Sequence, residues 1–220
     1  MSDGTEMIRV TQATELDDAT RAALASGRAE PALGLFVDTL MAMRGISERE
    51  GDVVSGAALE SEIPADMSPN ALDMAFAAIE RGGVPKSRAM AYPELANLPV
   101  ELREAIQTAE RRTTWKTIGP GIRRLDLGSK GRLKAEIIRL EAGKAVPWHT
   151  HKGRELTLCI HGEYADGLAT YGPGDFSITD GSVRHQPKAN EAGPAYALAV
   201  TDAGLKFEGL LGALQKLIGQ

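Results

Sequence analysis

The stretch GKAVPWHTHKGRELTLCIHG, residues 143–162, places two histidines and a glutamate on either side of a short turn. Side chains two apart on a β-strand point to the same face, so His149 and His151 can aim at one point. Glu155 follows a Lys-Gly-Arg turn at the start of the next strand-like run, and His185 lies 30 residues beyond it. Three imidazoles and one carboxylate are a suitable donor set for Zn²⁺, Fe²⁺, Mn²⁺ or Ni²⁺. The sequence therefore predicts a metal site built from these four residues.

The region around this stretch has the pattern of an all-β domain. Strand-like runs alternate with Gly, Pro, Asp and Lys turns at the spacing of a sandwich or barrel. In one run, Leu133, Ala135 and Ile137 alternate with charged residues, as expected of a half-buried strand. The last part, FEGLLGALQKLIG, predicts an amphipathic helix over 207–219. The expected strands are TTWKTI (113–118), GIRRLDL (121–127), RLKAEIIRL (132–140), ELTLCIHG (155–162), DFSITD (175–180) and PAYALAVTD (194–202).

Cys159 is the only cysteine of the 220 residues, which excludes an internal disulfide and a multi-cysteine zinc site. It shares strand parity with Glu155 and Thr157, so the three side chains should face the same way. Two interpretations are open: an inert buried thiol, or an oxidisable group near the metal that tunes a redox response. His161, the fourth histidine, stands beside the glycine of a turn and is expected at the surface or rim.

Residues 1–84 have a helical pattern. Thr14 with Asp17 predicts an N-terminal cap, and Gly27 predicts the end of that helix. Pro31 suits the first position of a second helix, whose apolar residues form one stripe that we interpret as a bundle seam or a partner-binding face. The stripe consists of Leu33, Phe36, Val37, Leu40 and Met41, and two more helices are expected over 47–59 and 69–81.

Residues 85–112 are punctuated by prolines and predict a linker with one short helix over 100–109. The chain has a net charge of −5, distributed unevenly. Residues 1–92 carry 15 acidic and 8 basic side chains, a net of −7, and the rest carry 15 acidic and 17 basic, a net of +2. An acidic N-terminal part argues against direct nucleic-acid binding. It suits a basic protein partner, although from charge alone we favour the interpretation as a solvated acidic surface.

The sequence gives no sign of a membrane segment. Its apolar runs are too short to span a bilayer. The start, MSDGTEMIRV, lacks the basic and apolar blocks of a secretory signal. We therefore expect a cytoplasmic protein without membrane contact.

The opening stretch resembles the first of two cupin motifs, G-x5-H-x-H-x3-E-x6-G, with Gly143 and Gly162 at its glycine positions. The second motif is matched by Gly174 and His185, with Gly181 in the turn and Thr179 where the motif has proline. Cupins form a double-stranded β-helix barrel with the metal inside its mouth. The resemblance implies an α plus all-β, two-domain chain, with a small N-terminal helical bundle in 1–84 and a C-terminal cupin barrel in 113–220 that includes the final helix.

A more specific resemblance covers about half the chain, residues 98–214. The blocks LPVELREAI, WKTIGPGIRRLDL, AVPWHTHKGRELTLCIHGEYAD, YGPGDF, RHQP and LAVTDAGLKFEGLLGAL resemble the C-terminal domain of ChrR-type anti-sigma factors. The segment ALASGRAEPALGLFVDTLMAM is similar to their sigma-binding domain. The family implies N-terminal helices that hold an extracytoplasmic-function sigma factor away from RNA polymerase. It also implies a cupin domain that takes part in the response to singlet oxygen or organic hydroperoxides and binds zinc through His149, His151, Glu155 and His185.

The chain departs from this family in its N-terminal part. The family usually has a zinc motif, H-x3-C-x2-C, where this chain aligns Leu40, Arg44 and Ser47. None of the three is a zinc ligand, so we expect no zinc in this domain. Its stability must then come from helix packing, with Leu40 in the apolar stripe and Ser47 as a helix cap.

Three functions follow from these observations, and we favour the first. In the first, implied by the resemblance, the chain would be a transcriptional regulator that binds a sigma factor through N-terminal helices, with buried contacts from the Phe36 and Phe76 faces. The alternatives are a metal-dependent cupin enzyme of dioxygenase type and a cupin that binds a small ligand. Pairing of barrel edges would give a homodimer. No flanking residue demands catalysis, although the site is flanked by Glu163, Tyr164, Arg184 and Gln186.

Overall fold

The computed structural model describes residues 15–27, 29–46, 70, 72–74, 76–77, 90–128, 131–202 and the backbone of 205–207. The predicted helix over 47–59, the domain boundary at 84–85 and everything from residue 208 on lie outside these residues. They stay predictions.

The centre of the fold is a six-stranded antiparallel sheet, and its strands match the six predicted runs. Because each run is long enough to show alternation, the sequence pattern located all six. In spatial order the strands are β1 (Lys116–Gly119), β2 (Ile122–Gly128), β3 (Lys134–Leu140), β10 (Ala195–Thr201), β5 (Glu155–His161) and β8 (Phe176–Thr179).

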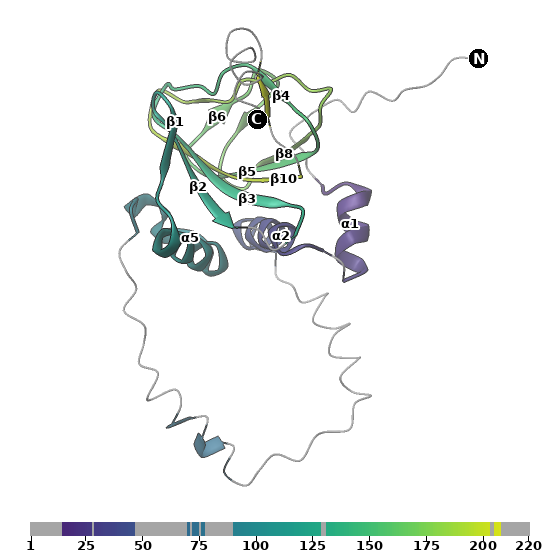
Figure 1. Ribbon diagram of the computed structural model, residues 1–220, viewed down its shortest axis with the longest axis vertical. Coiled ribbons are helices and arrows are strands. Elements are labelled where there is room, and N and C mark those ends of the chain that lie inside the picture. Colours follow the sequence, from purple (N-terminus) through teal and green to yellow (C-terminus); the bar gives the residue numbers. More distant parts are fainter. Residues whose placement is uncertain are drawn as a thin grey trace, which may run out of the picture.

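Two small sheets complete the β domain, and their strands were not predicted. Each of these strands has only two or three residues, too few to show a period. Together with the large sheet they give the antiparallel, barrel-like domain of Figure 1, which confirms the α plus all-β fold class. One small sheet holds β7 (Thr170–Tyr171), β6 (Tyr164–Ala165) and β9 (Lys188–Ala189), and the other pairs β11 (Leu205–Phe207) with β4 (His149–His151).

Strand β5 shows how the two faces of the large sheet differ. Leu156 and Leu158 are buried in the main hydrophobic core. The alternate residues Glu155 and Thr157 line a cavity inside the β domain, and Cys159 packs in a second, smaller core. The predicted shared face of these three residues is confirmed, and it turns toward the barrel interior.

Three helices lie on the outer face of the large sheet (Figure 1). The first, α1 (Asp18–Ala25), is capped by Asp17, whose side chain accepts a hydrogen bond of 2.9 Å from the Thr20 N–H. The cap predicted at Thr14 is therefore wrong, because the acidic residue three positions later makes the capping bond itself. Gly27 follows the helix with φ +64°, as its predicted role as a helix end requires.

The other two helices are α2 (Pro31–Met43) and α5 (Val100–Arg112), which follows a short 3-10 helix, η1 (Pro93–Asn97). α5 confirms the helix predicted at 100–109 and extends it by one turn. Across the described residues, no helix is both long enough and apolar enough to cross a membrane.

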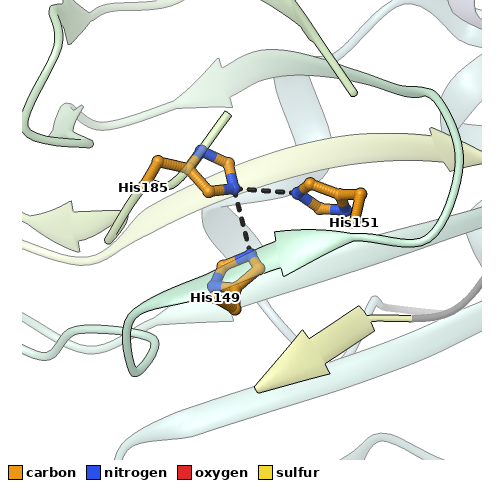
Figure 2. A group of neighbouring side chains, drawn as sticks. All are labelled: His149, His151 and His185. Carbon is orange, nitrogen blue, oxygen red and sulfur yellow. Dashed lines mark hydrogen bonds between the residues drawn. The ribbon is translucent and has the colours of Figure 1, made fainter. Parts of the chain in front are cut away.

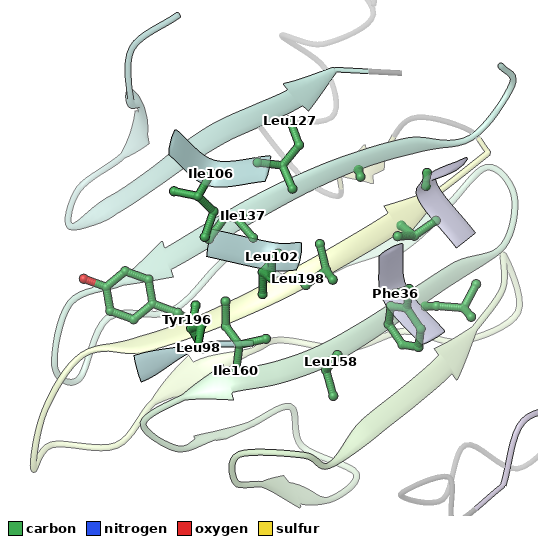
Figure 3. Packing of buried hydrophobic residues seen from close by; sticks show 14 of the residues in the cluster. Phe36, Leu98, Leu102, Ile106, Leu127, Ile137, Leu158, Ile160, Tyr196 and Leu198 are labelled. Carbon is green, nitrogen blue, oxygen red and sulfur yellow. The ribbon is translucent and has the colours of Figure 1, made fainter. Parts of the chain in front are cut away.

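The apolar stripe of α2 is buried against the β domain. Phe36 is fully buried and meets Phe176 of β8 edge to face, with ring centroids 6.0 Å apart. Figure 3 shows it in one core with Leu102 of α5 and with Leu158 and Leu198 of the sheet. The interpretation of the stripe as the seam of a separate helical bundle is thus wrong, and its role as a partner-binding face stays a prediction. Periodicity shows which helix face is buried, but not what covers it.

Polar contacts at both ends of α2 add to this packing. Glu30, before the helix, accepts a hydrogen bond of 2.8 Å from the Leu133 N–H. Arg44, after it, donates from Nε to the Gly174 carbonyl at 3.0 Å, and its guanidinium lies 5.1 Å from the centre of the Phe176 ring. Arg44 therefore fastens the end of α2 to the β domain.

Candidate metal centre

Three buried histidines converge inside the β domain (Figure 2). His149 and His151 come from β4, and alternation along the strand turns both side chains inward. His185 lies in a loop that pairs with β4. The N–H of His149 donates to the His185 carbonyl at 3.2 Å, and the reverse hydrogen bond measures 3.1 Å. These two backbone hydrogen bonds place His185 beside β4, although it lies 34 residues beyond His151 in the sequence.

The spacing of the imidazole nitrogens fits a bound cation. The Nε2 atom of His185 lies 2.9 Å from that of His151 and 3.0 Å from that of His149. One ring nitrogen has either a hydrogen or a lone pair in the ring plane, so it cannot satisfy both neighbours. Zn–N bonds of about 2.0–2.1 Å would place two nitrogens of a tetrahedral site roughly 3.4 Å apart. Rotamer shifts of a few tenths of an ångström would therefore fit the three rings around one ion.

Glu155 lies beside the histidine cluster, in contact with His151. Its Oε2 atom lies 3.2 Å from His151 Nε2 and accepts a hydrogen bond of 3.1 Å from the Thr157 hydroxyl. Burial raises the pKa of this carboxyl to about 7. A buried carboxylate beside converging lone pairs is stabilised by a positive ion. The structure thus brings the three histidines together and places Glu155 in contact with one of them, His151.

Burial also keeps the imidazoles in the form that binds metals. Burial is the main reason that the pKa of His149 is lowered to about 4 and that of His151 to about 3. The electrostatic effect of the neighbouring His185 lowers both pKa values further. Both rings are therefore neutral at pH 7, and their lone pairs are available to a cation without loss of a proton.

The turns that carry this cluster depend on glycine. Gly162 has φ +72°, and a β-carbon there would collide with the Pro194 carbonyl oxygen. Gly181 has no positive φ, but a β-carbon would lie 2.9 Å from the His151 carbonyl oxygen. These two motif glycines are thus needed for close approach of the backbone.

Asp166 is a site residue that the sequence analysis missed. It is 1% exposed, and its Oδ2 atom lies 3.7 Å from His185 Nδ1. Burial disfavours its charge, yet the neighbouring His185 ring and hydrogen bonds from two backbone N–H groups and from the Tyr171 hydroxyl lower its pKa overall. Carboxylates in this position fix the ring orientation of metal-binding histidines. The only sequence signal was its Asp-Gly turn, which predicts a loop and not this contact.

We expect Asp166→Asn to weaken zinc binding about 10- to 100-fold, because it removes the charge that orients His185. Competition with a chromophoric chelator measures the affinity. Asp175→Asn is the matched control, since Asp175 accepts a turn hydrogen bond from the Gly172 N–H and is not paired with a histidine. Equal zinc affinities of the two variants would show that Asp166 does not support the site.

Cys159 and His161 lie outside the cluster. The Cys159 sulfur is fully buried, and burial raises the pKa of its thiol to about 12. A protonated, inaccessible thiol is a poor redox group, so the structure favours the inert interpretation. His161 is half-buried, and its ring lies 5.7 Å from that of Tyr196.

Comparison with known proteins gives a consistent set of matches. The family described as the ChrR cupin-like domain matches residues 103–201. The anti-sigma-E factor ChrR of Cereibacter sphaeroides is 31% identical over 200 residues, which cover 89% of this chain and 92% of that protein. A crystal structure of Rhodobacter sphaeroides SigE in complex with the anti-sigma ChrR aligns with a TM-score of 0.59 and 28% identity. That alignment covers 85% of this chain and 97% of the solved chain.

Proposed function

The chain belongs to the ChrR family of anti-sigma factors, and on that basis we propose that it binds a sigma factor and holds a zinc ion in its β domain. The observation that carries the sigma-factor proposal is the extent of the match, which includes the N-terminal part and nearly the whole length of the relative. The solved complex of a relative with a sigma factor gives the partner class. Cytoplasmic location and barrel-edge dimerisation stay predictions.

The proposed contact surface for the sigma factor lies after α2. The stripe around Phe36 is already buried on the β domain, so it is not available to a partner in this arrangement. Leu72, Met74 and Phe76 are instead 61%, 65% and 57% exposed in a short helical region. Exposed large apolar side chains that gather in one segment are typical of interaction sites. We assign these three residues to the sigma interface.

The zinc assignment rests on the donor set. Three imidazoles and one carboxylate would complete a four-coordinate site, as in structural zinc centres, where the protein fills every position. Zinc itself is not redox-active. Any response to oxidants suggested by the family resemblance would therefore act on the ligands or on a molecule bound beside them, since the Cys159 thiol is buried and protonated.

One arginine supports communication between the metal centre and the helices. Arg154 stands in the turn between His151 and Glu155. Its Nη2 atom donates to the Asp17 carboxylate at 2.5 Å and to the Thr20 hydroxyl at 2.6 Å, both at the start of α1. A shift of the metal-binding turn would thus pull directly on α1.

Co-expression with sigma factors of the same organism, followed by affinity purification, tests the proposal. We expect a stoichiometric complex that survives at micromolar concentration and about one zinc per chain by elemental analysis. A folded, zinc-loaded chain that captures no sigma factor would refute the anti-sigma role. Bound iron with O₂ consumption would instead support a cupin enzyme.

A further inference from the structure

A cavity of about 240 Å³ lies inside the β domain beside the metal centre. His149 and Glu155 form part of its wall. The space exists because the inward positions of β10 are all small: Ala195, Ala197 and Ala199 alternate along the strand and line it. Since an engineered cavity of about 150 Å³ is enough for benzene, this one can hold a single ring or a short chain with a polar head group.

The strand register gives the cavity a charged and an apolar part. Lys134 pairs with Thr201, which pairs with Glu155 across β3, β10 and β5. Farther along the same face of these strands, Ile138 pairs with Ala197 and Leu140 pairs with Ala195. A ligand with one polar end and an apolar body would match this division, with its polar end toward the metal ligands.

Tyr164 adds an unused hydrogen-bond donor to this wall. The side chain is 3% exposed and lines the cavity, with its ring stacked on Tyr171 at 5.0 Å between centroids. Among the described residues, its hydroxyl has no hydrogen-bond partner. A buried hydroxyl without a partner is costly and requires a specific explanation. A ligand oxygen would supply the missing acceptor.

The charges of the lining select the sign of that ligand. Arg124 and Lys134 contribute two positive charges, and Asp126, Glu136 and Glu155 contribute three negative ones, a formal sum of −1. Arg124 and Glu136 are paired with each other at 3.3 Å. A divalent ion on the histidines changes the sum to +1, so the loaded cavity favours an anion.

We propose that this cavity is an effector site for a small monocarboxylate, with its apolar body along Ile138 and the β10 alanines and its carboxylate toward Tyr164 and the metal centre. This inference rests on the proposed zinc site. It assigns a class of ligand to the cavity of the β domain. The ligand would lie next to the turn that contains Arg154, whose side chain contacts the start of α1.

Sodium benzoate is a suitable probe, titrated by calorimetry into the full-length chain with its zinc content measured beforehand. We expect benzoate to bind at least about tenfold more tightly than benzyl alcohol or benzylammonium, which lack the anionic head. Ala197→Leu fills the cavity without touching a metal ligand and should abolish benzoate binding. Ala192→Leu makes the same change in an exposed turn and should preserve it.

A second variant guards against misfolding of the enlarged core. Tyr164→Phe keeps the ring and removes only the donor, so benzoate affinity should fall about tenfold while zinc content and melting temperature are retained. Zinc-loaded protein that does not bind benzoate, or that binds it equally in both leucine variants, overturns the effector site and leaves the metal centre in place. A chain that takes up no zinc overturns the metal centre, and the effector site with it.

Discussion

Replacing His185 by alanine is expected to abolish tight zinc binding and to lower the melting temperature of the zinc-loaded protein by roughly 10 °C. His185 is the residue whose ring nitrogen lies within 3.0 Å of both other imidazole nitrogens, so its loss opens the centre of the cluster. A ligand that binds only the folded state adds about 4 kcal/mol when its concentration is a thousand times its dissociation constant. For a chain of this size, each kcal/mol corresponds to about 2–4 °C.

His161→Ala is the matched control, because it removes the one histidine outside the cluster. Its melting temperature should still rise on addition of zinc and fall on addition of a chelator, whereas that of His185→Ala should respond to neither. Differential scanning fluorimetry with and without chelator measures both. A zinc-dependent shift that persists in His185→Ala would move the metal site elsewhere.

Two phenylalanine variants are expected to separate folding from sigma binding. Phe36→Ala should reduce the free energy of unfolding by about 3–5 kcal/mol, because it empties a fully buried site against Phe176. Phe76→Ala should change it by less than about 0.5 kcal/mol, because this side chain is 57% exposed. The second change should instead weaken sigma-factor binding by at least about tenfold, as loss of an apolar anchor does.

Urea denaturation followed by tryptophan fluorescence reports the first effect, since Trp115 packs against the main core. Titration of the purified sigma factor at low temperature, where both variants remain folded, reports the second. If Phe76→Ala bound the sigma factor as tightly as the unchanged chain, the contact surface assigned to Leu72, Met74 and Phe76 would be wrong.

The clustering of the candidate metal ligands could be predicted because their geometry is local. His149 and His151 lie on one strand, and the motif glycines fix the turns that bring in Glu155 and His185. Asp166 could not be predicted, because its position beside His185 depends on the pairing of loops that have no period. For a related reason, the sequence predicted only part of the packing of the α2 stripe. Its buried face was clear from spacing, but its contact with Phe176 crosses 140 residues and is decided by tertiary packing.

The position of Arg154 has a thermodynamic consequence. Its side chain holds the start of α1, and its backbone belongs to the turn between two of the proposed zinc ligands, His151 and Glu155. If sigma-factor binding alters the position of α1, the coupling is reciprocal: the sigma factor must change the affinity for zinc by the same factor by which zinc changes the affinity for the sigma factor. The fraction of the chain bound to the sigma factor would then depend on the free concentrations of both zinc and the sigma factor.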